Sequence, residues 1–209
     1  DLEGRDVRRL TSSPGTESAP AFSPDGSLIA FSGQYDGNVD VFVVPAGGGL
    51  PRRLTWHPAA DIVAGFTPDG RSVLFVSGRF SANRFYTRLF TVPVTGGEPE
   101  MLEIPNAADA EISPDGRFIA YTPFAEAFSQ WKNYRGGRFS RIWIFDTASR
   151  DVEKLPQPAS RSNDVDPMWA GGRIVFRSDR NGEFNLFAFD PATKKIDQLT
   201  DFRDFPVLS

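Results

Sequence analysis

Short apolar runs separated by polar turns fill this chain from end to end. Four runs rich in Ile, Val, Leu and Phe each follow a glycine-containing turn, and a further apolar run follows each of them. The first set covers residues 27–31, 72–76, 118–121 and 174–176, and the second set covers 40–44, 88–92, 141–145 and 185–189. These lengths are typical of strands, and no segment has a convincing helical period. The pattern predicts an all-β protein.

One turn phrase recurs along the sequence. It reads Phe-Ser-Pro-Asp-Gly at 22–26, Phe-Thr-Pro-Asp-Gly at 66–70 and Ile-Ser-Pro-Asp-Gly at 112–116, and a shortened copy, Met-Trp-Ala-Gly-Gly, occupies 168–172. The steps from Pro24 to Pro68 and from Pro68 to Pro114 are 44 and 46 residues. Proline fixes φ in such a phrase and glycine accepts a left-handed conformation, so each copy predicts a tight hairpin turn.

A fourth element completes each repeat. After the second apolar run a polar turn leads to a short segment that ends at 53–55, 100–102, 153–155 or 198–200, twice as Leu-Thr. Four strands per repeat of about 40 to 60 residues indicate a β-propeller blade. The predicted repeats are 18–55, 61–103, 109–155 and 165–200. Residues 1–15 read as the last strand of a preceding blade and 201–209 as the first strand of a following one, so we expect a partial propeller of about four blades from a larger one.

Composition narrows the classes of function. The chain is 40% hydrophobic and 24% charged, and its formal net charge is −4. It therefore lacks the basic footprint that favours nucleic acid or an anionic membrane surface. It has no cysteine, which excludes disulfides, thiolate zinc sites and cysteine nucleophiles. We predict no cofactor, no metal and no membrane-spanning segment. Because the chain begins with Asp1-Leu2-Glu3, without an initiator methionine or a signal peptide, we expect it to be part of a longer protein.

Three polar features of the sequence could indicate a chemical function, but each also has a simpler structural explanation. His57 is the single histidine and would have to be the general base of any Ser-His-Asp machinery, but no nucleophile elbow accompanies it. The stretch 36–40, Asp-Gly-Asn-Val-Asp, resembles the start of a calcium loop, yet the glycine and glutamate that such a loop needs are missing. Asp25, Asp69 and Asp115 recur with the repeat and are explained by turn chemistry. We predict no catalytic residue in this chain.

An insertion at 122–140 in the third repeat is the most distinctive segment, because it is longer than an ordinary connection. It places aromatic side chains beside basic ones, a mixture that suits peptides through aromatic contact and guanidinium pairing. The alternative is that the aromatic side chains pack the insertion onto its own blade or onto a neighbouring domain or subunit. The residues predicted to contact a peptide or another domain are Trp131, Lys132, Tyr134, Arg135 and Arg138.

The repeats resemble the WD40-like repeats of the TolB, dipeptidyl-peptidase and tricorn propellers. Three stretches, 35–41, 54–61 and especially Trp-Lys-Asn-Tyr-Arg-Gly-Gly at 131–137, make the chain similar to the first propeller of the tricorn protease family. That resemblance covers essentially the whole chain. It implies a six-bladed first propeller, followed by a seven-bladed one, a PDZ domain and catalytic modules with Ser/His chemistry that lie downstream of residue 209.

The resemblance implies a non-catalytic propeller that gates or channels peptides to the core of a cytoplasmic serine peptidase, with peptides and the other domains and subunits of that protein as partners. An alternative is a TolB-type interaction propeller in the periplasm, without an attached enzyme. A dipeptidyl-peptidase-like propeller is a third reading and would require an α/β-hydrolase domain. Blade faces normally covered by neighbours would be exposed in a four-blade chain, so we also expect it to self-associate.

Overall fold

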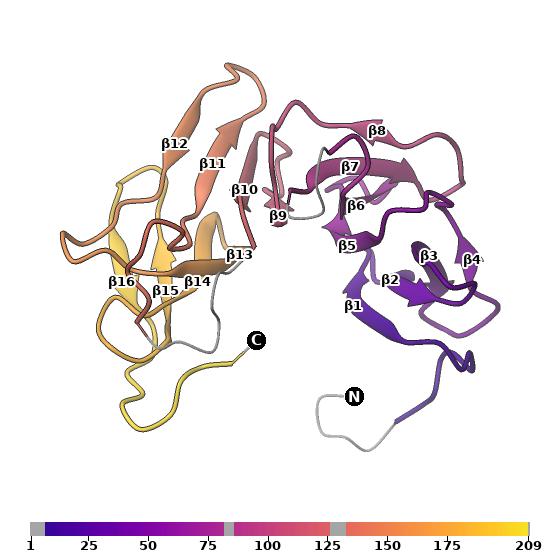
Figure 1. The fold of residues 1–209 in the computed structure, drawn as a ribbon, viewed down its shortest axis with the longest axis horizontal. Coiled ribbons are helices and arrows are strands. Elements are labelled where there is room, and N and C mark those ends of the chain that lie inside the picture. Colours follow the sequence, from indigo (N-terminus) through magenta and orange to yellow (C-terminus); the bar gives the residue numbers. More distant parts are fainter. Residues whose placement is uncertain (1–6, 82–85, 126–132, 209) are drawn as a thin grey trace. The chain divides into compact units, whose positions relative to one another are not determined.

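The computed structural model describes residues 7–81, 86–125 and 133–208, and these residues form four antiparallel sheets of four strands each (Figure 1). The predicted all-β propeller fold is confirmed. Contacts divide the chain into two compact units, residues 1–79 with 90–101 and residues 80–89 with 102–209. Among the described residues, no helix is long and apolar enough to cross a membrane.

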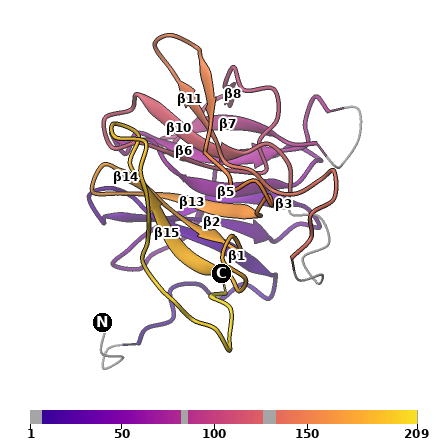
Figure 2. The ribbon, with the colours of Figure 1, turned by 90° about the vertical axis from the view of Figure 1, so that its left-hand side faces the viewer.

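Each sheet is one blade with its strands in sequence order. Blade 1 contains β1 (Glu17–Phe22), β2 (Leu28–Gln34), β3 (Val39–Pro45) and β4 (Arg52–Arg53). Blade 2 contains β5 (Asp61–Phe66), β6 (Ser72–Ser77), β7 (Arg88–Pro93) and β8 (Glu100–Met101). Blade 3 contains β9 (Asp109–Ile112), β10 (Phe118–Thr122), β11 (Trp143–Asp146) and β12 (Val152–Lys154). Blade 4 contains β13 (Asp164–Ala170), β14 (Arg173–Ser178), β15 (Asn185–Phe189) and β16 (Ile196–Gln198), and Figure 2 shows β14 and β15 next to each other.

The described end segments contain no strand. Residues 7–13 and 201–208 have neither strand nor bridge assignments, although the sequence predicted a strand in each. A strand needs a ladder of hydrogen bonds to a neighbour, whereas residues 201–208 make isolated bonds such as that from the Val207 N–H to the Phe184 carbonyl at 2.8 Å. Their assignment to neighbouring blades stays a prediction.

The hairpin turns follow the predicted chemistry. In the first turn the Gly26 N–H donates to the Ser23 carbonyl at 2.8 Å, and Gly26 has a φ of 70°. The Asp25 Oδ1 accepts hydrogen bonds from the Ser23 hydroxyl at 2.6 Å and from the Ser27 N–H at 3.0 Å. These bonds, chiefly the one from Ser23, lower the pKa of the Asp25 carboxyl to about 2. The turns at Asp69 and Asp115 repeat this pattern, so the turn reading of the three aspartates is confirmed.

The closing Leu-Thr pair also has a structural role. In blade 1 the Leu54 N–H donates to the Val41 carbonyl at 2.8 Å, and the Thr55 hydroxyl accepts the Val41 N–H at 2.9 Å. Blade 4 uses Leu199, Thr200 and Leu186 in the same way, at 2.8 and 2.9 Å. The threonine therefore continues the ladder where the short fourth strand ends.

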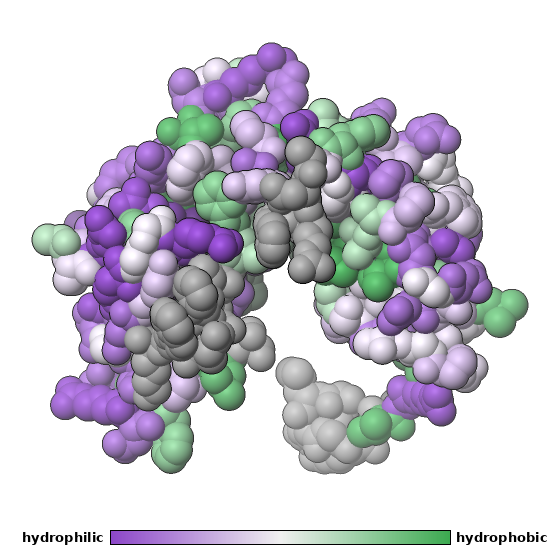
Figure 3. Space-filling view, in the orientation of Figure 1, coloured by the Kyte–Doolittle hydropathy of each residue, from purple (hydrophilic) through white to green (hydrophobic). Residues whose placement is uncertain are grey.

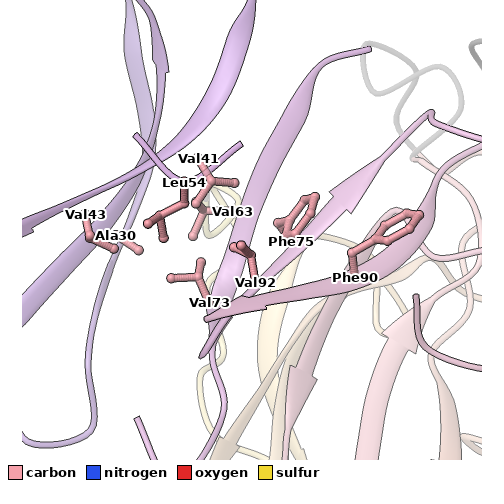
Figure 4. Packing of buried hydrophobic residues seen from close by; sticks show 9 residues of the cluster. All are labelled: Ala30, Val41, Val43, Leu54, Val63, Val73, Phe75, Phe90 and Val92. Atoms are coloured by element: carbon pink, nitrogen blue, oxygen red, sulfur yellow. The ribbon is translucent and has the colours of Figure 1, made fainter. Parts of the chain in front are cut away.

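Each unit has its own core between two blades. In unit 1 the packed side chains come from the facing sheets of blades 1 and 2, and Figure 4 labels them: Ala30, Val41, Val43, Leu54, Val63, Val73, Phe75, Phe90 and Val92. In unit 2 the core between blades 3 and 4 contains Ala120, Ile142, Ile144, Leu155, Ile174, Phe176, Phe187 and Phe189. Exposed apolar side chains are scattered as separate green areas among hydrophilic ones in Figure 3. Blade-to-blade burial of alternate residues is thus the main source of stability in each unit.

Candidate functional site

The insertion predicted from the sequence connects β10 to β11 within unit 2. The structure describes residues 123–125 and 133–142 of this connection, whereas Trp131 and Lys132 lie outside the described residues. The other three predicted contact residues, Tyr134, Arg135 and Arg138, lie within the described residues.

Arg135 is anchored on a buried carboxylate of blade 4. Its Nη1 donates to the Asp179 Oδ2 at 2.6 Å, and its Nη2 donates to the Asp179 carbonyl at 3.3 Å. Asp179 is buried, with an exposed fraction of 1%, so the guanidinium neutralises a charge that water cannot reach. The structure therefore gives Arg135 an internal partner, and its contact with a peptide stays a prediction.

Asn163, a residue with no recognisable motif in the sequence, stabilises this contact between Arg135 and Asp179. Its backbone N–H and its Nδ2 donate to the two oxygens of Asp179 at 2.7 and 2.9 Å. The Nδ2 also donates to the Tyr134 carbonyl at 2.9 Å, and the Oδ1 accepts the Ser140 N–H at 3.1 Å. Every polar group of the Asn163 side chain is thus used to hold the insertion on blade 4. The polar run Ser-Asn-Asp at 162–164, which leads into β13, was the available signal in the sequence.

A second contact involves Arg161. Its Nη1 donates to the Arg135 carbonyl at 3.0 Å, and its guanidinium carbon lies 5.0 Å from the centroid of the Phe139 ring. Arg141 lies over the same ring at 4.5 Å. Two guanidinium groups therefore hold one aromatic ring by cation-π contacts, which fixes residues 139–141.

A cavity of about 410 Å³ lies beside these residues, entirely within unit 2. Its lining combines aromatic and basic side chains: Tyr86, Pro123, Phe124, Gly137, Arg138, Phe139, Ser140, Arg141 and Trp143. The Tyr86 and Phe124 rings meet edge to face with centroids 5.8 Å apart, and they are 42% and 44% exposed. The cavity therefore offers aromatic surface to a ligand.

Within the described ranges, the arginines that line the cavity have no carboxylate partner like the one that neutralises Arg135. Arg138 is exposed, and no described carboxylate forms an ion pair with it. Arg141 donates its Nε to the Gln157 Oε1 at 3.3 Å, and it likewise has no ion pair within the described ranges. Unpaired guanidinium groups beside aromatic surface can bind a carboxylate together with an apolar side chain. Of the predicted contact residues, Arg138 lines this cavity.

The structure gives His57 and the stretch 36–40 structural roles. The His57 Nδ1 accepts the Ala59 N–H at 3.0 Å, so its ring belongs to a turn. Asp36 and Asp40 both pair with the Arg53 guanidinium, at 2.9 and 2.6 Å, which places a cation of the protein where a calcium ion would have to bind. No group of three or more His, Cys, Asp or Glu in the described part of the chain could hold a metal ion.

Two carboxyl groups on the first strand of blade 3 have raised pKa values. Burial raises the pKa of Asp109 to about 6, and the nearby Asp166 carboxylate adds to the effect. Burial also raises the pKa of Glu111, whose Oε2 accepts the Trp169 N–H at 2.5 Å. These groups lie between β9 and β13 and do not line the cavity.

The fold and the repeated turns define the class of protein, a β-propeller with four-stranded blades. The family model for the tricorn protease N-terminal β-propeller domain matches residues 1–209, and the chain belongs to that family. This confirms the resemblance to the tricorn protease family.

Curated relatives are similar along most of the chain. Tricorn protease homolog 1 of Streptomyces coelicolor is 31% identical over 189 residues, which cover 90% of this chain and 17% of that protein. The tricorn protease homolog of Saccharolobus solfataricus is 28% identical over 204 residues, which cover 94% of this chain and 18% of that protein. The chain thus spans less than a fifth of the length of these relatives.

Solved structures agree on the fold. The crystal structure of the tricorn protease matches with a TM-score of 0.80 and 24% identity over 99% of this chain and 20% of that one. The crystal structure of TolB from Acinetobacter baumannii matches with a TM-score of 0.73 and 19% identity, over 96% of this chain and 47% of that one.

Proposed function

We propose that this chain is the non-catalytic propeller portion of a tricorn-like serine peptidase, and that it gates or channels peptides to a catalytic core elsewhere in the longer protein. The observation that carries this proposal is the match of residues 1–209 to the tricorn N-terminal propeller family. The proposal is also supported by the turn hydrogen bonds of His57 and of the recurring aspartates, which give these side chains a structural role. The partners of the propeller are peptides and the other domains and subunits of the parent protein.

The test compares the 209-residue chain with the parent protein on fluorogenic peptides of increasing length. We expect turnover by the parent, no turnover by the 209-residue chain, and a dependence of the parent's rate on peptide length. A parent variant in which the insertion at 133–140 is replaced by a Gly-Ser linker of equal length should change the length dependence. Turnover by the 209-residue chain, or a length dependence unaffected by the replacement, would contradict the proposal.

A second candidate is a TolB-like interaction propeller without an attached enzyme. It is supported by the TolB protein of Syntrophus aciditrophicus, which is 46% identical over 52 residues, 24% of this chain. The intact mass of the parent protein separates the two candidates. A protein of about the length of the tricorn relatives favours the peptidase, whereas a chain that ends after a few more blades favours the interaction propeller.

Location in the cell distinguishes the same candidates. We propose a cytoplasmic parent for the peptidase and a periplasmic one for the TolB-like alternative. Fractionation of source cells with antibodies against this chain tests the location. We also propose that the isolated chain self-associates, for which light scattering over a range of concentrations is the measurement; a monomer at all concentrations would contradict it.

A further inference from the structure

We propose that the cavity next to the insertion binds a peptide carboxylate together with a neighbouring aromatic or large aliphatic side chain. This inference rests on the proposed function for its class of ligand and adds a site to it. The site consists of the aromatic side chains Tyr86, Phe124 and Trp143 and the basic side chains Arg138 and Arg141.

The apolar part of the site has the size and exposure that a side chain needs. A cavity of about 410 Å³ lies within the range of small-ligand sites, roughly 300 to 1,000 Å³. Tyr86 and Phe124 are nearly half exposed, although aromatic side chains of this size are normally covered in a folded core. Their edge-to-face contact leaves ring surface turned toward solvent, and an apolar peptide side chain could cover that surface.

The charged part of the site is selective for an anion. Arg135 and Arg180 lie in the same unit and are neutralised by the buried Asp179 and Asp164. Arg138 and Arg141 have no such carboxylate among the described residues, so their remaining N–H donors are available. A guanidinium group matches a carboxylate through two parallel hydrogen bonds, and two of them beside one cavity favour a carboxylate over a neutral amide.

The site is held in place before a ligand arrives. Phe139 lies under the guanidinium groups of Arg141 and Arg161, and Asn163 holds the Ser140 N–H. Because residues 139–141 are already fixed, binding loses little side-chain freedom. The arginines thus have different roles in this proposal. Arg135 holds the insertion on blade 4, and Arg138 and Arg141 bind the ligand.

The test is fluorescence anisotropy with the 209-residue chain and three fluorescein-labelled peptides. The first is Gly-Gly-Ala-Phe with a free C-terminal carboxylate, the second is the same peptide with a C-terminal amide, and the third is Gly-Gly-Glu-Phe with a C-terminal amide. We expect the first peptide to bind about 10-fold more tightly than the second, because only the first carries the carboxylate. The third peptide distinguishes the sources of the carboxylate: tight binding means that a side chain suffices, and weak binding means that the chain terminus is required.

Variants locate the binding. Arg138→Gln and Arg141→Gln should each weaken binding of the first peptide about 10-fold and leave the second unchanged. Phe124→Ser should weaken both peptides, because it removes apolar surface. The matched control is Arg71→Gln, which removes the same charge from an exposed turn of unit 1. Thermal unfolding of each variant establishes that it is folded.

Equal affinity for the first two peptides, or an unchanged affinity in both arginine variants, would overturn the inference. This outcome is separable from failure of the proposed function, since binding is measured without catalysis. A parent that cleaves peptides while the 209-residue chain binds none contradicts only the cavity assignment. A parent without peptidase activity whose propeller still selects the free carboxylate contradicts only the peptidase assignment.

Discussion

Blades 2 and 4 contain the same buried ion-pair clasp, one in each unit. In blade 2 it comprises Asp61, Ser77 and Arg79, and in blade 4 it comprises Asp164, Ser178 and Arg180. The aspartate is paired with the serine across the first two strands in both blades. The arginine bonds the aspartate and lies over two phenylalanine rings, at 5.3 and 5.2 Å in blade 2 and at 5.0 and 5.1 Å in blade 4.

The two clasps differ in how completely the carboxylate is hydrogen-bonded. Besides Arg180, Asp164 accepts hydrogen bonds from the Ser162 hydroxyl at 2.9 Å, the Ser178 hydroxyl at 2.6 Å and the Gln157 Nε2 at 3.1 Å. The Asp61 Oδ1 is buried, and no described group donates to it. Ala59 stands two residues before Asp61, where blade 4 has Ser162. The repeat thus preserves the ion pair and the aromatic contacts, whereas the other donors vary from blade to blade.

Removing the carboxylate should affect blade 4 more than blade 2. Asp164→Ala leaves the Arg180 charge buried and removes the acceptor of the Ser162 and Ser178 hydroxyls, so we expect it to lower the free energy of unfolding by about 3–5 kcal/mol. Asp61→Ala also strands its arginine but removes an oxygen that lacked a donor, so its cost should be lower by about 1 kcal/mol. Urea denaturation followed by tryptophan fluorescence measures both. Equal losses would mean that the extra hydrogen bonds of blade 4 contribute nothing.

Asp109 adds a pH dependence to unit 2 that would obscure this comparison. Burial raises its folded pKa to about 6, above its usual value, so its protonated form favours the folded state. That contribution is complete below about pH 4 and is lost as the pH rises through about 6. Asp109→Asn should therefore raise the free energy of unfolding by about 1–2 kcal/mol at pH 7.5 and have no such effect at pH 4.

Thermal unfolding of the wild type and the Asp109→Asn variant at both pH values checks this expectation. A gain that is equal at pH 4 and pH 7.5 would show that Asp109 is not the group that titrates. In the Asp109→Asn background, the loss of unfolding free energy caused by Asp164→Ala reports on the ion-pair clasp without the titration of Asp109.

The smallest expected effect comes from a substitution that makes the ion-pair clasp of blade 2 resemble that of blade 4. Ala59→Ser places a hydroxyl where blade 4 has Ser162, so it can donate to the orphan Asp61 Oδ1. We expect stabilisation of about 1 kcal/mol, and none when the same substitution is made in the Asp61→Ala background. The double-mutant cycle in urea is the measurement, and a gain that persists without Asp61 would rule out the hydrogen bond as its cause.

The fold follows from features that act locally, which is why the sequence predicts it well. A Pro-Asp-Gly turn sets its own dihedral angles and hydrogen bonds, and the apolar runs on either side have the length of strands. The shortened copy also behaves locally, since Gly171 and Gly172 both have positive φ in a two-residue turn. Each repeat therefore specifies its own turns and strands from local sequence, whereas the stability of a blade also depends on packing against its neighbour.

The candidate site depends on partners that are distant in sequence, and it could be predicted only in part. The aromatic and basic composition of the insertion indicated binding, and Arg138 does line the cavity. The sequence did not reveal that Arg135 would pair with Asp179, 44 residues away, nor that Tyr86 of an earlier loop would complete the lining. Such pairings depend on how one blade packs on the next, and no local spacing encodes that.

Because of the hydrogen bonds of Asn163, part of the insertion belongs to blade 3 by sequence but is expected to unfold together with blade 4. Residues 134–140 belong by sequence to blade 3, yet the Tyr134 carbonyl and the Ser140 N–H are bonded to a side chain of blade 4. Hydrogen exchange reports the opening of cooperative units rather than the order of the chain. The Ser140 amide should therefore exchange with deuterium at the rate set by opening of the β13–β14 edge, so that the insertion and blade 4 form one foldon.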